Sequence, residues 1–562
     1  MGETRRGWDD LRRIWLGPLF LVAPAAALAL GVAFGVDWYL NRPPELHDLG
    51  PVALLFNYDL ETLQNALGNL AQTVSAVMGL VITVVAIVVQ LAATRYTPRV
   101  TELFFRERTN ILVLGFFIVA CLLAIWVSLS VGNGFLPRVS VVASLAAVTI
   151  SLLLVVPYFA YVFDFLEPEK VVSRIQEHAV AATRAGLGAE EAQARVLGAV
   201  EQLADIAVAA VASQDKIISA RAVDAMRTLL VDYLSTKARL PAAWFEPGAA
   251  LCRNPDFLSM NHEALSDIAR GRLWLEWKVL RQYQTAYNES LDKNPDMNYL
   301  IAINTRYVGE AALAKADQRV VGLVVKFMNT YLRATLNRRQ IRTAYNILNQ
   351  YRQLAESMIV SGAADLVAEI AGYLRYYGQT AHGMDLGFVT ETISYDLATL
   401  CEVAHELDSP AHEALLAALL ELDKEAESEA QEATLRGVRK AQARLATYYL
   451  QRGDEATARR IRHDMELERP ERLASIRDEL LAVKSKDFWE VIDRGANFDY
   501  MDDARKALLR TFFGWFPAID AAGTPRRTRR LDAAAVTPGA PTAPTGGEPA
   551  RPAETAPAGR AP

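Results

Sequence analysis

The stretch that decides the fold is residues 69–108, NLAQTVSAVMGLVITVVAIVVQLAATRYTPRVTELFFRER. Its apolar core, residues 74–93, is long enough to cross a bilayer as a helix, which takes about 20 residues. Small side chains recur at every fourth position, so they share one face of this helix and let a second helix approach closely. These helix-packing residues are Ala71, Ser75, Gly79 and Thr83. We therefore expect a membrane span here that packs against another helix.

Polar residues follow the apolar core and mark the level at which the chain leaves the membrane. Gln90 is the deepest strong hydrogen-bonding side chain, and it either bonds to a neighbouring helix or lines a pore. Thr97 and Pro98 have the pattern of an N-cap followed by proline at the first helical position. The next ten residues put apolar and charged side chains on opposite faces, as in a helix that lies on the membrane surface. The membrane-interface motif consists of Gln90, Arg95, Pro98, Arg99, Phe104, Arg106 and Arg108.

Three further apolar stretches have the length of a span: about 14–36, 111–129 and 139–162. Together with residues 70–93 they predict four spans. The first is too long for the apolar core of a signal peptide. Four arginines lie in residues 1–13 and four in the loop after the second span, whereas the opposite loops carry about one each. By the positive-inside rule both termini face the cytosol. We expect a multi-pass protein of the cytoplasmic (inner) membrane.

The rest of the chain predicts an all-α fold. The transmembrane region (14–165) is followed by residues 166–520, where helical periodicity runs almost throughout and no convincing strand run occurs. We expect antiparallel helical hairpins there, and stacking as a solenoid is one arrangement open to them. Residues 445–461 are similar to a tetratricopeptide helix pair, but no clean 34-residue period supports true repeats. The tail, residues 521–562, is rich in proline and alanine and is expected to be disordered.

Composition narrows the class of function. The net charge of −6 is mild and argues against nucleic acid as the main partner. The three cysteines are far apart in the sequence, which fits a reduced cytosol. Cys401, His405 and His412 come closest to a set of metal ligands, but core packing and surface roles explain them better. No phosphate loop, dinucleotide fingerprint, zinc-protease motif or nucleophile elbow is present. We expect no enzyme activity, no cofactor and no metal ion.

The interface motif also carries a family resemblance. Gln90, Leu91 and Ala92 followed by Pro98, Arg99, Phe104, Arg106 and Arg108 resemble a pattern in a bacterial predicted-membrane-protein family, domain of unknown function 2254. This sequence has Thr94 and Tyr96 where that family tends to have serine and phenylalanine. The resemblance implies a four-span N-terminal region, specific over residues 60–120 and extending to about 165. It implies no biochemical activity, and the cytosolic half departs from the family pattern.

Three classes of function follow from these observations. The first is a membrane-anchored scaffold or sensor, in which the cytosolic helices bind an unknown protein and Arg99, Glu102 and Arg106 pair with Glu167 and Glu169 below the fourth span. The second is an oligomeric channel or weakly selective transporter, since four spans with little polar lining form a pore only between subunits. The third is an enzyme. The expected partners are the lipid bilayer, a protein on the helical domain and, in the second case, further copies of the chain.

Overall fold

The structure is a computed structural model of the 562-residue chain. It describes residues 60–95, 107–131, 137–184, 188–422, 429–487 and 497–516, together with positions 28, 31–33, 36, 39–40, 101, 104–105 and 494. The N-terminal segment 1–13, most of the expected first span (14–36) and the tail 521–562 lie outside the described residues. In the described residues all regular elements are helices and no strand occurs, which confirms the all-α fold class.

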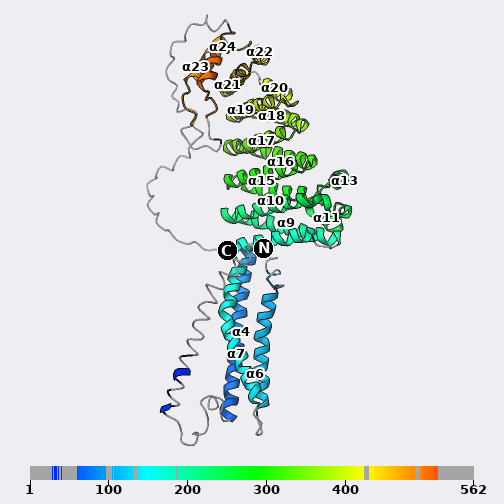
Figure 1. Cartoon of the computed structure of the whole chain (residues 1–562), viewed down its shortest axis with the longest axis vertical. Helices are drawn as coiled ribbons and strands as arrows, with labels where there is room; N and C mark the ends of the chain where they lie inside the picture. The colour runs from blue at the N-terminus through cyan, green and yellow to red at the C-terminus, as the bar shows by residue number, and fades with distance from the viewer. Residues whose placement is uncertain are drawn as a thin grey trace, which may run out of the picture. The chain divides into compact units, whose positions relative to one another are not determined.

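Three helices carry the apolar part of the described chain: α4 (Leu60–Arg95), α6 (Arg108–Ser130) and α7 (Arg138–Phe165) (Figure 1). Each is long and apolar enough to cross a membrane. They correspond to the expected spans 70–93, 111–129 and 139–162. The helices are longer than the apolar stretches because helical geometry continues through flanking polar turns, most of all at the start of α4.

Helices α6 and α7 pack along one face of α4. Leu63 and Leu67 lie in a buried cluster with side chains of α6 and α7, and Ala71 and Val74 lie in a second cluster with the same helices. Ser75 Oγ lies 3.0 Å from Cys121 Sγ on α6. Lipid tails offer no hydrogen bonds, so polar side chains in a bilayer are satisfied by other helices or by their own backbone.

The chain divides into two units. Unit 1 comprises Met1–Leu445 and Asp487–Phe498, and unit 2 comprises Ala446–Lys486 and Asp499–Pro562. The helices of unit 1 beyond the spans are α8 (Pro168–Arg184), α9 (Ala189–Ala212), α10 (Lys216–Thr236), α11 (Ala249–Arg253), α12 (Pro255–Leu258), α13 (His262–Gly271), α14 (Trp274–Ser290), α15 (Pro295–Leu313), α16 (Gln318–Asn337), α17 (Ile341–Val360), α18 (Ala364–Gly383), α19 (Gly387–Glu406), α20 (His412–Leu420) and the greater part of α21 (Glu429–Arg452), with short 3-10 turns η3 (Lys237–Arg239) and η4 (Ala242–Trp244).

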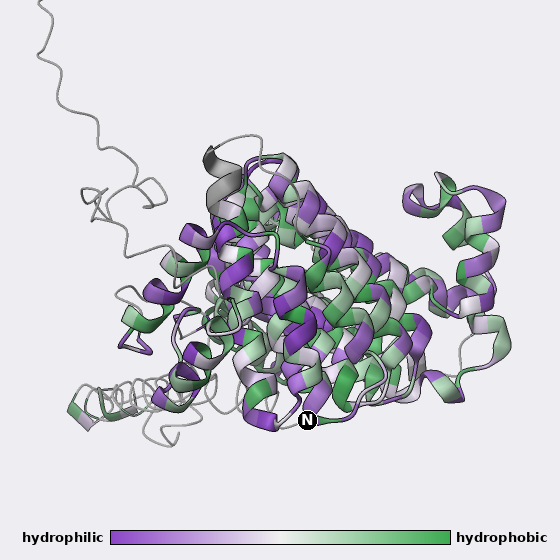
Figure 2. Ribbon diagram, turned by 90° about the horizontal axis from the view of Figure 1, so that it is seen from above, coloured by the Kyte–Doolittle hydropathy of each residue, from purple (hydrophilic) through white to green (hydrophobic). Residues whose placement is uncertain are grey.

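We call the part of unit 1 that follows α7 the helical body. Its helices stack in two layers: α8, α10, α15, α17 and α19 lie side by side in layer B, and α9, α14, α16, α18 and α20 in layer A. Figure 1 shows the successive helices of the stack. Each helix carries hydrophobic and hydrophilic stripes along its length (Figure 2), as expected for helices buried on one side. The body is therefore a solenoid-like array of helical hairpins.

The same turn connects helix after helix in this array. In six turns of the described chain a residue without glycine's freedom adopts a positive φ: Gln214, Arg272, Ala316, Arg339, Asp385 and Asp408. The next amide donates to the carbonyl five residues earlier, as Asp317 does to Ala312 and Leu386 does to Ala381. This six-to-one bond is that of a Schellman motif, and it satisfies carbonyls that the helix end leaves free. Asp215 and Asp317 also cap the following helix with their side chains.

The turns give the middle of the array a regular spacing. Three layer-B helices begin at Pro295, Ile341 and Gly387, which is a spacing of 46 residues. Helical arrays of this type commonly have periods of about 40–47 residues, longer than the 34 residues of tetratricopeptide repeats. Residues 237–273, with the short helices α11 to α13, interrupt the pattern between α10 and α14, and we call them the insertion.

In its described residues, unit 2 contains the end of α21 and three further helices: α22 (Glu455–Asp464), α23 (Pro470–Ala482) and α24 (Asp503–Phe513). Phe512 and Phe513 on α24 pack with Trp515 and Phe516, and Arg462 lies over the Phe516 ring. These aromatic side chains form much of its core.

Candidate functional site

The membrane helices meet the helical body at a cluster that we call the junction, formed by Phe104, Asn110, Tyr158, Phe165 and Arg174. Phe104 is fully buried, and its ring packs edge-on against Phe165 with ring centroids 5.4 Å apart. Phe165 is the last residue of α7. Phe104, which lies between α4 and α6 in the chain, thereby contacts the end of α7.

Asn110 holds Phe104 from the side of α6. It is 1% exposed, and its side-chain amide donates to the backbone carbonyl of Phe104. Its Oδ1 accepts a hydrogen bond of 3.2 Å from the Tyr158 hydroxyl on α7. A buried amide that leaves a hydrogen bond unmade costs about 1–3 kcal/mol, so these contacts hold Phe104 in place.

Arg174 joins the spans to the helical body. It lies on the second turn of α8, and its guanidinium carbon lies 3.9 Å from the centre of the Phe165 ring. Its Nη1 also donates a 3.0 Å hydrogen bond to the Phe165 carbonyl, one of the carbonyls that the end of α7 leaves free. Burial is the main influence on this guanidinium and lowers its pKa, although acidic neighbours including Asp164 oppose that effect. A cation stacked on a ring with its donor satisfied is worth about 1–2 kcal/mol.

Among the described residues, the acidic side chains at and just after the end of α7 pair with nearby basic residues and not with the interface motif. Lys170 pairs with Asp164 and, at 2.9 Å, with Glu167. Glu169 lies 3.9 Å from Arg221 on α10. Pro98, Arg99, Glu102 and Arg106 lie outside the described residues, so their expected pairing with Glu167 and Glu169 stays a prediction.

The other residues of the interface motif lie apart from one another. Arg95 ends α4, with its side chain outside the description, and Gln90 is exposed on the same helix. Arg108 is exposed at the start of α6. Of the motif, only Phe104 lies in the junction among the described residues. Sequence reasoning missed Asn110 and Arg174, and only a polar residue beside an apolar span gave a signal for the first.

The helix-packing residues take two different positions on α4. Ala71 is buried against α6 and α7, and Ser75 contacts Cys121. Gly79 and Thr83 are exposed, and a Cβ added at Gly79 meets no atom within 4 Å in the described chain. Their expected packing against another helix stays a prediction.

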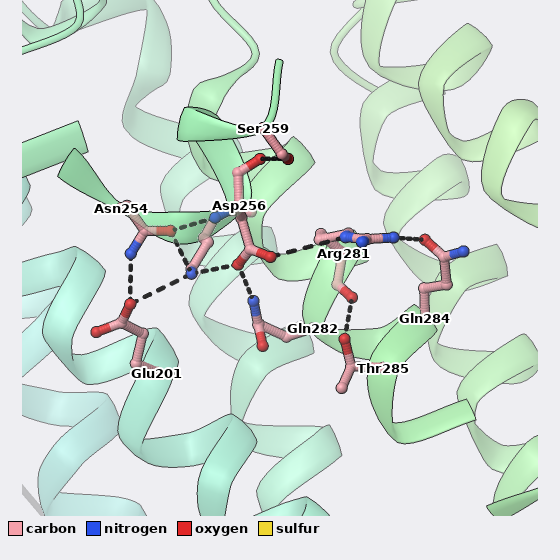
Figure 3. A network of polar contacts seen from close by, with 9 residues as sticks. Glu201, Asn254, Asp256, Ser259, Arg281, Gln282, Gln284 and Thr285 are labelled. Atoms are coloured by element: carbon pink, nitrogen blue, oxygen red, sulfur yellow. Dashed lines mark hydrogen bonds and ion pairs between the residues drawn. The ribbon is translucent and has the colours of Figure 1, made fainter. Parts of the chain in front are cut away.

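A second polar cluster clamps the insertion onto the helical body (Figure 3). Lys278 on α14 is 2% exposed, and its ammonium lies 2.6 Å from Asp256, 3.0 Å from Asn254 and 3.4 Å from Glu201. Figure 3 shows Asn254 and Asp256 of the insertion facing Glu201 on α9 and Gln282 on α14. The charge is thus compensated by groups from the insertion and from α9, which is how a buried ammonium persists.

A third polar cluster lies where the insertion begins, around Lys237. Lys237 contacts Glu276 at 2.5 Å and Asp317 at 2.8 Å. Glu276 is fully buried, and burial raises the pKa of its carboxyl above the ordinary 4.5 even though Lys237 opposes this shift. Both lysine clusters consist of ion pairs that connect helices.

The residues that come closest to a metal set do not assemble one in the described part of the chain. His405 and His412 lie with ring centroids 5.4 Å apart, and Cys401 is buried. Among the described residues no three histidine, cysteine, aspartate or glutamate side chains group as potential metal ligands.

Comparison with known proteins bears on the spans. Residues 12–227 match the model of a family described as "Predicted membrane protein (DUF2254)". This confirms the resemblance seen in the interface motif, and the match extends beyond the spans to include α8, α9 and part of α10. Together with the three apolar helices it identifies a membrane protein.

Two other comparisons add little. No curated protein matches the chain. A solved structure described as a circular tandem repeat protein with novel repeat topology and enhanced subunit contact surfaces is similar over 57% of this chain and 80% of its own, with 19% identity and a TM-score of 0.28.

Proposed function

We propose that the chain is a membrane-anchored scaffold or sensor, whose helical body binds a protein partner on the cytosolic side of the cytoplasmic (inner) membrane. In this proposal the body acts by binding and not by catalysis, without a cofactor. Stacked helical hairpins present extended surfaces that bind proteins or peptides. Both termini are proposed to be cytosolic, on the basis of the arginine distribution.

The observation that carries the proposal is an open apolar and aromatic face on α15 in layer B. Leu300 and Ile303 are half-buried and Tyr307 is 39% exposed, all on one side of the helix. Arg306 and Arg227 lie over the Tyr307 ring at 4.4 and 5.5 Å. Tyrosine and arginine are enriched among the residues that contribute most to protein–protein binding.

The junction supports the sensor part of the proposal. Arg174 contacts the end of α7 and belongs to α8, which begins layer B. A displacement of the spans is therefore passed first to the layer that carries Tyr307.

A photo-crosslinking amino acid in place of a tyrosine tests this proposal in intact membranes. Tyr307 on layer B is the test position, and Tyr376 on layer A, 50% exposed and also beneath an arginine, is the matched control. We expect a crosslinked protein from position 307 and not from 376. Equal yields at both positions, or no protein adduct at either, would contradict the proposal.

The alternative, an oligomeric channel or weakly selective transporter, rests on a different face. α4 exposes small and polar side chains at a near-heptad spacing: Asn65, Asn69, Gln72, Ala76, Gly79, Thr83, Ala86 and Gln90. Copies of this face around an axis would give a polar lining. Ion flux through liposomes that hold the purified chain, abolished by Gln90→Leu, would favour this alternative. Flux no higher than in empty liposomes, at several voltages, would exclude it.

A further inference from the structure

One segment of the chain lies in unit 1 although its flanks belong to unit 2. Residues 487–498 pack in unit 1, whereas residues 446–486 and the chain from 499 onward form unit 2. Two described side chains of this segment, Arg494 and Phe498, lie against helices α17 and α19 of layer B. The structure thus places two side chains of this segment against the face of a helical array.

Arg494 contacts a carboxylate, a backbone carbonyl and an aromatic ring of two helices. Its guanidinium forms a two-pronged ion pair with Asp396 on α19, and the two side chains are 5% and 3% exposed. Its Nη2 also donates a 2.9 Å hydrogen bond to the carbonyl of Tyr345 on α17, and its guanidinium carbon lies 4.4 Å from the centre of that ring. A planar guanidinium matches such a forked carboxylate and ring better than an ammonium does.

Phe498 is recognised by aromatic side chains. Its ring stacks on Tyr395 of α19 with centroids 4.8 Å apart and 9° between the planes. It also contacts Tyr345 edge-on at 6.2 Å. The residues between the two anchors include Gly495 and Ala496, which are small.

The carboxylate keeps a partner when the segment leaves. Arg352 on α17 lies 3.4 Å from Asp396, so the aspartate retains a cation without Arg494. An empty groove therefore does not bury an isolated charge, which would be expensive.

We propose that this face of α17 and α19 is a peptide-binding groove for a protein segment with an arginine followed four residues later by an aromatic residue, and that Arg494 and Phe498 occupy it in cis. The inference rests on the proposed role of the body as an interaction domain and names the partner's chemistry. A partner competes with a tethered occupant, whose effective concentration is in the millimolar range for a short tether.

Fluorescence anisotropy with the full chain in detergent tests the groove. The probe is a labelled peptide of residues 487–500, and the receptors are the wild type and an Arg494→Ala, Phe498→Ala variant. We expect the variant to bind the probe at least tenfold more tightly, and Asp396→Asn in the variant to abolish binding. The control is the same peptide with alanine at the Arg494 position, which we expect not to bind. Equal affinity of the two receptors, or of the two peptides, overturns the inference.

A second measurement does not depend on the folding of the double variant. In an otherwise wild-type chain with Asn497→Cys, excess unlabelled peptide is expected to accelerate alkylation of the new thiol, and an unchanged rate overturns the inference. If the alkylation rate does not change but position 307 still crosslinks to a protein, the groove alone is refuted. Peptide binding without a crosslinked partner refutes the proposed function alone.

Discussion

Phe104 and Phe165 pack edge against face with ring centroids 5.4 Å apart, and this contact joins the loop between two spans to the end of a third. Arg174 covers the other side of the contact from the first helix of the body. The three residues form a continuous path from the membrane helices to layer B.

The contact predicts a sharp difference between neighbouring phenylalanines. Phe104→Ala leaves a cavity at a fully buried site, and such changes cost about 3–5 kcal/mol. Phe105 is 53% exposed, so Phe105→Ala is expected to change stability by less than about 1 kcal/mol. Chemical unfolding of both detergent-purified variants measures the difference, and similar losses for the two would refute the packing at the junction.

The buried lysine of the insertion clamp predicts a second difference. Lys278→Met leaves Asp256 and Glu201 without their shared cation, and breaking a buried pair in this way costs about 3 kcal/mol or more. Lys293, 48% exposed and paired with Glu289 on the same turn, is the control, and its methionine variant is expected to change stability by less than about 0.5 kcal/mol. Measuring the free energy of unfolding of each variant tests this difference between Lys278 and Lys293.

Glu276 predicts a pH dependence with a definite sign. Burial raises the pKa of its carboxyl in the folded chain above 4.5, so between 4.5 and that raised value the folded state holds a proton that the unfolded state releases. Its contribution to stability is therefore fully present below pH 4.5, the ordinary value, and is lost as the pH rises through the folded pKa. Wild type should lose stability relative to Glu276→Gln over this window. A difference between the two proteins that stays constant with pH would refute the raised pKa.

Two glycines, one in a turn between helices and one inside a helix, are predicted to respond in opposite ways to substitution by alanine. Gly362 has φ +78°, where a Cβ is strained, so Gly362→Ala is expected to destabilise by about 1 kcal/mol. Gly372 lies within α18 with open space at its Cβ, and Gly372→Ala is expected to stabilise by about 0.5–1 kcal/mol. The sign of the change in the unfolding midpoint tests this, and two changes of the same sign would contradict the turn geometry.

The spans and the all-α class were predictable because composition and periodicity decide them. The turns were not, because Gln214, Ala316, Arg339 and Asp385 adopt a left-handed conformation that a glycine would have indicated in the sequence. Without those boundaries the 46-residue spacing of the layer-B helices is hidden in the sequence.

The junction was predictable in part. Phe104 stood out as an apolar residue of the interface motif, but the sequence pattern put it on a membrane surface rather than in a buried contact. Arg174 is one of several arginines on amphipathic helices, and only the approach of α8 to the end of α7 distinguishes it. Arg494 and Asp396 are 98 residues apart in the chain, so no local pattern relates them.

The central claim is that the spans hold the helical body on the cytosolic side of the membrane. Cys252 lies in the body and is exposed, whereas Cys121 and Cys401 are buried. A membrane-impermeant maleimide, applied to intact expressing cells and to permeabilised ones, reports the side on which Cys252 lies, with Cys252→Ser as the control. The account predicts labelling of Cys252 only after permeabilisation, and equal labelling in intact cells would contradict it.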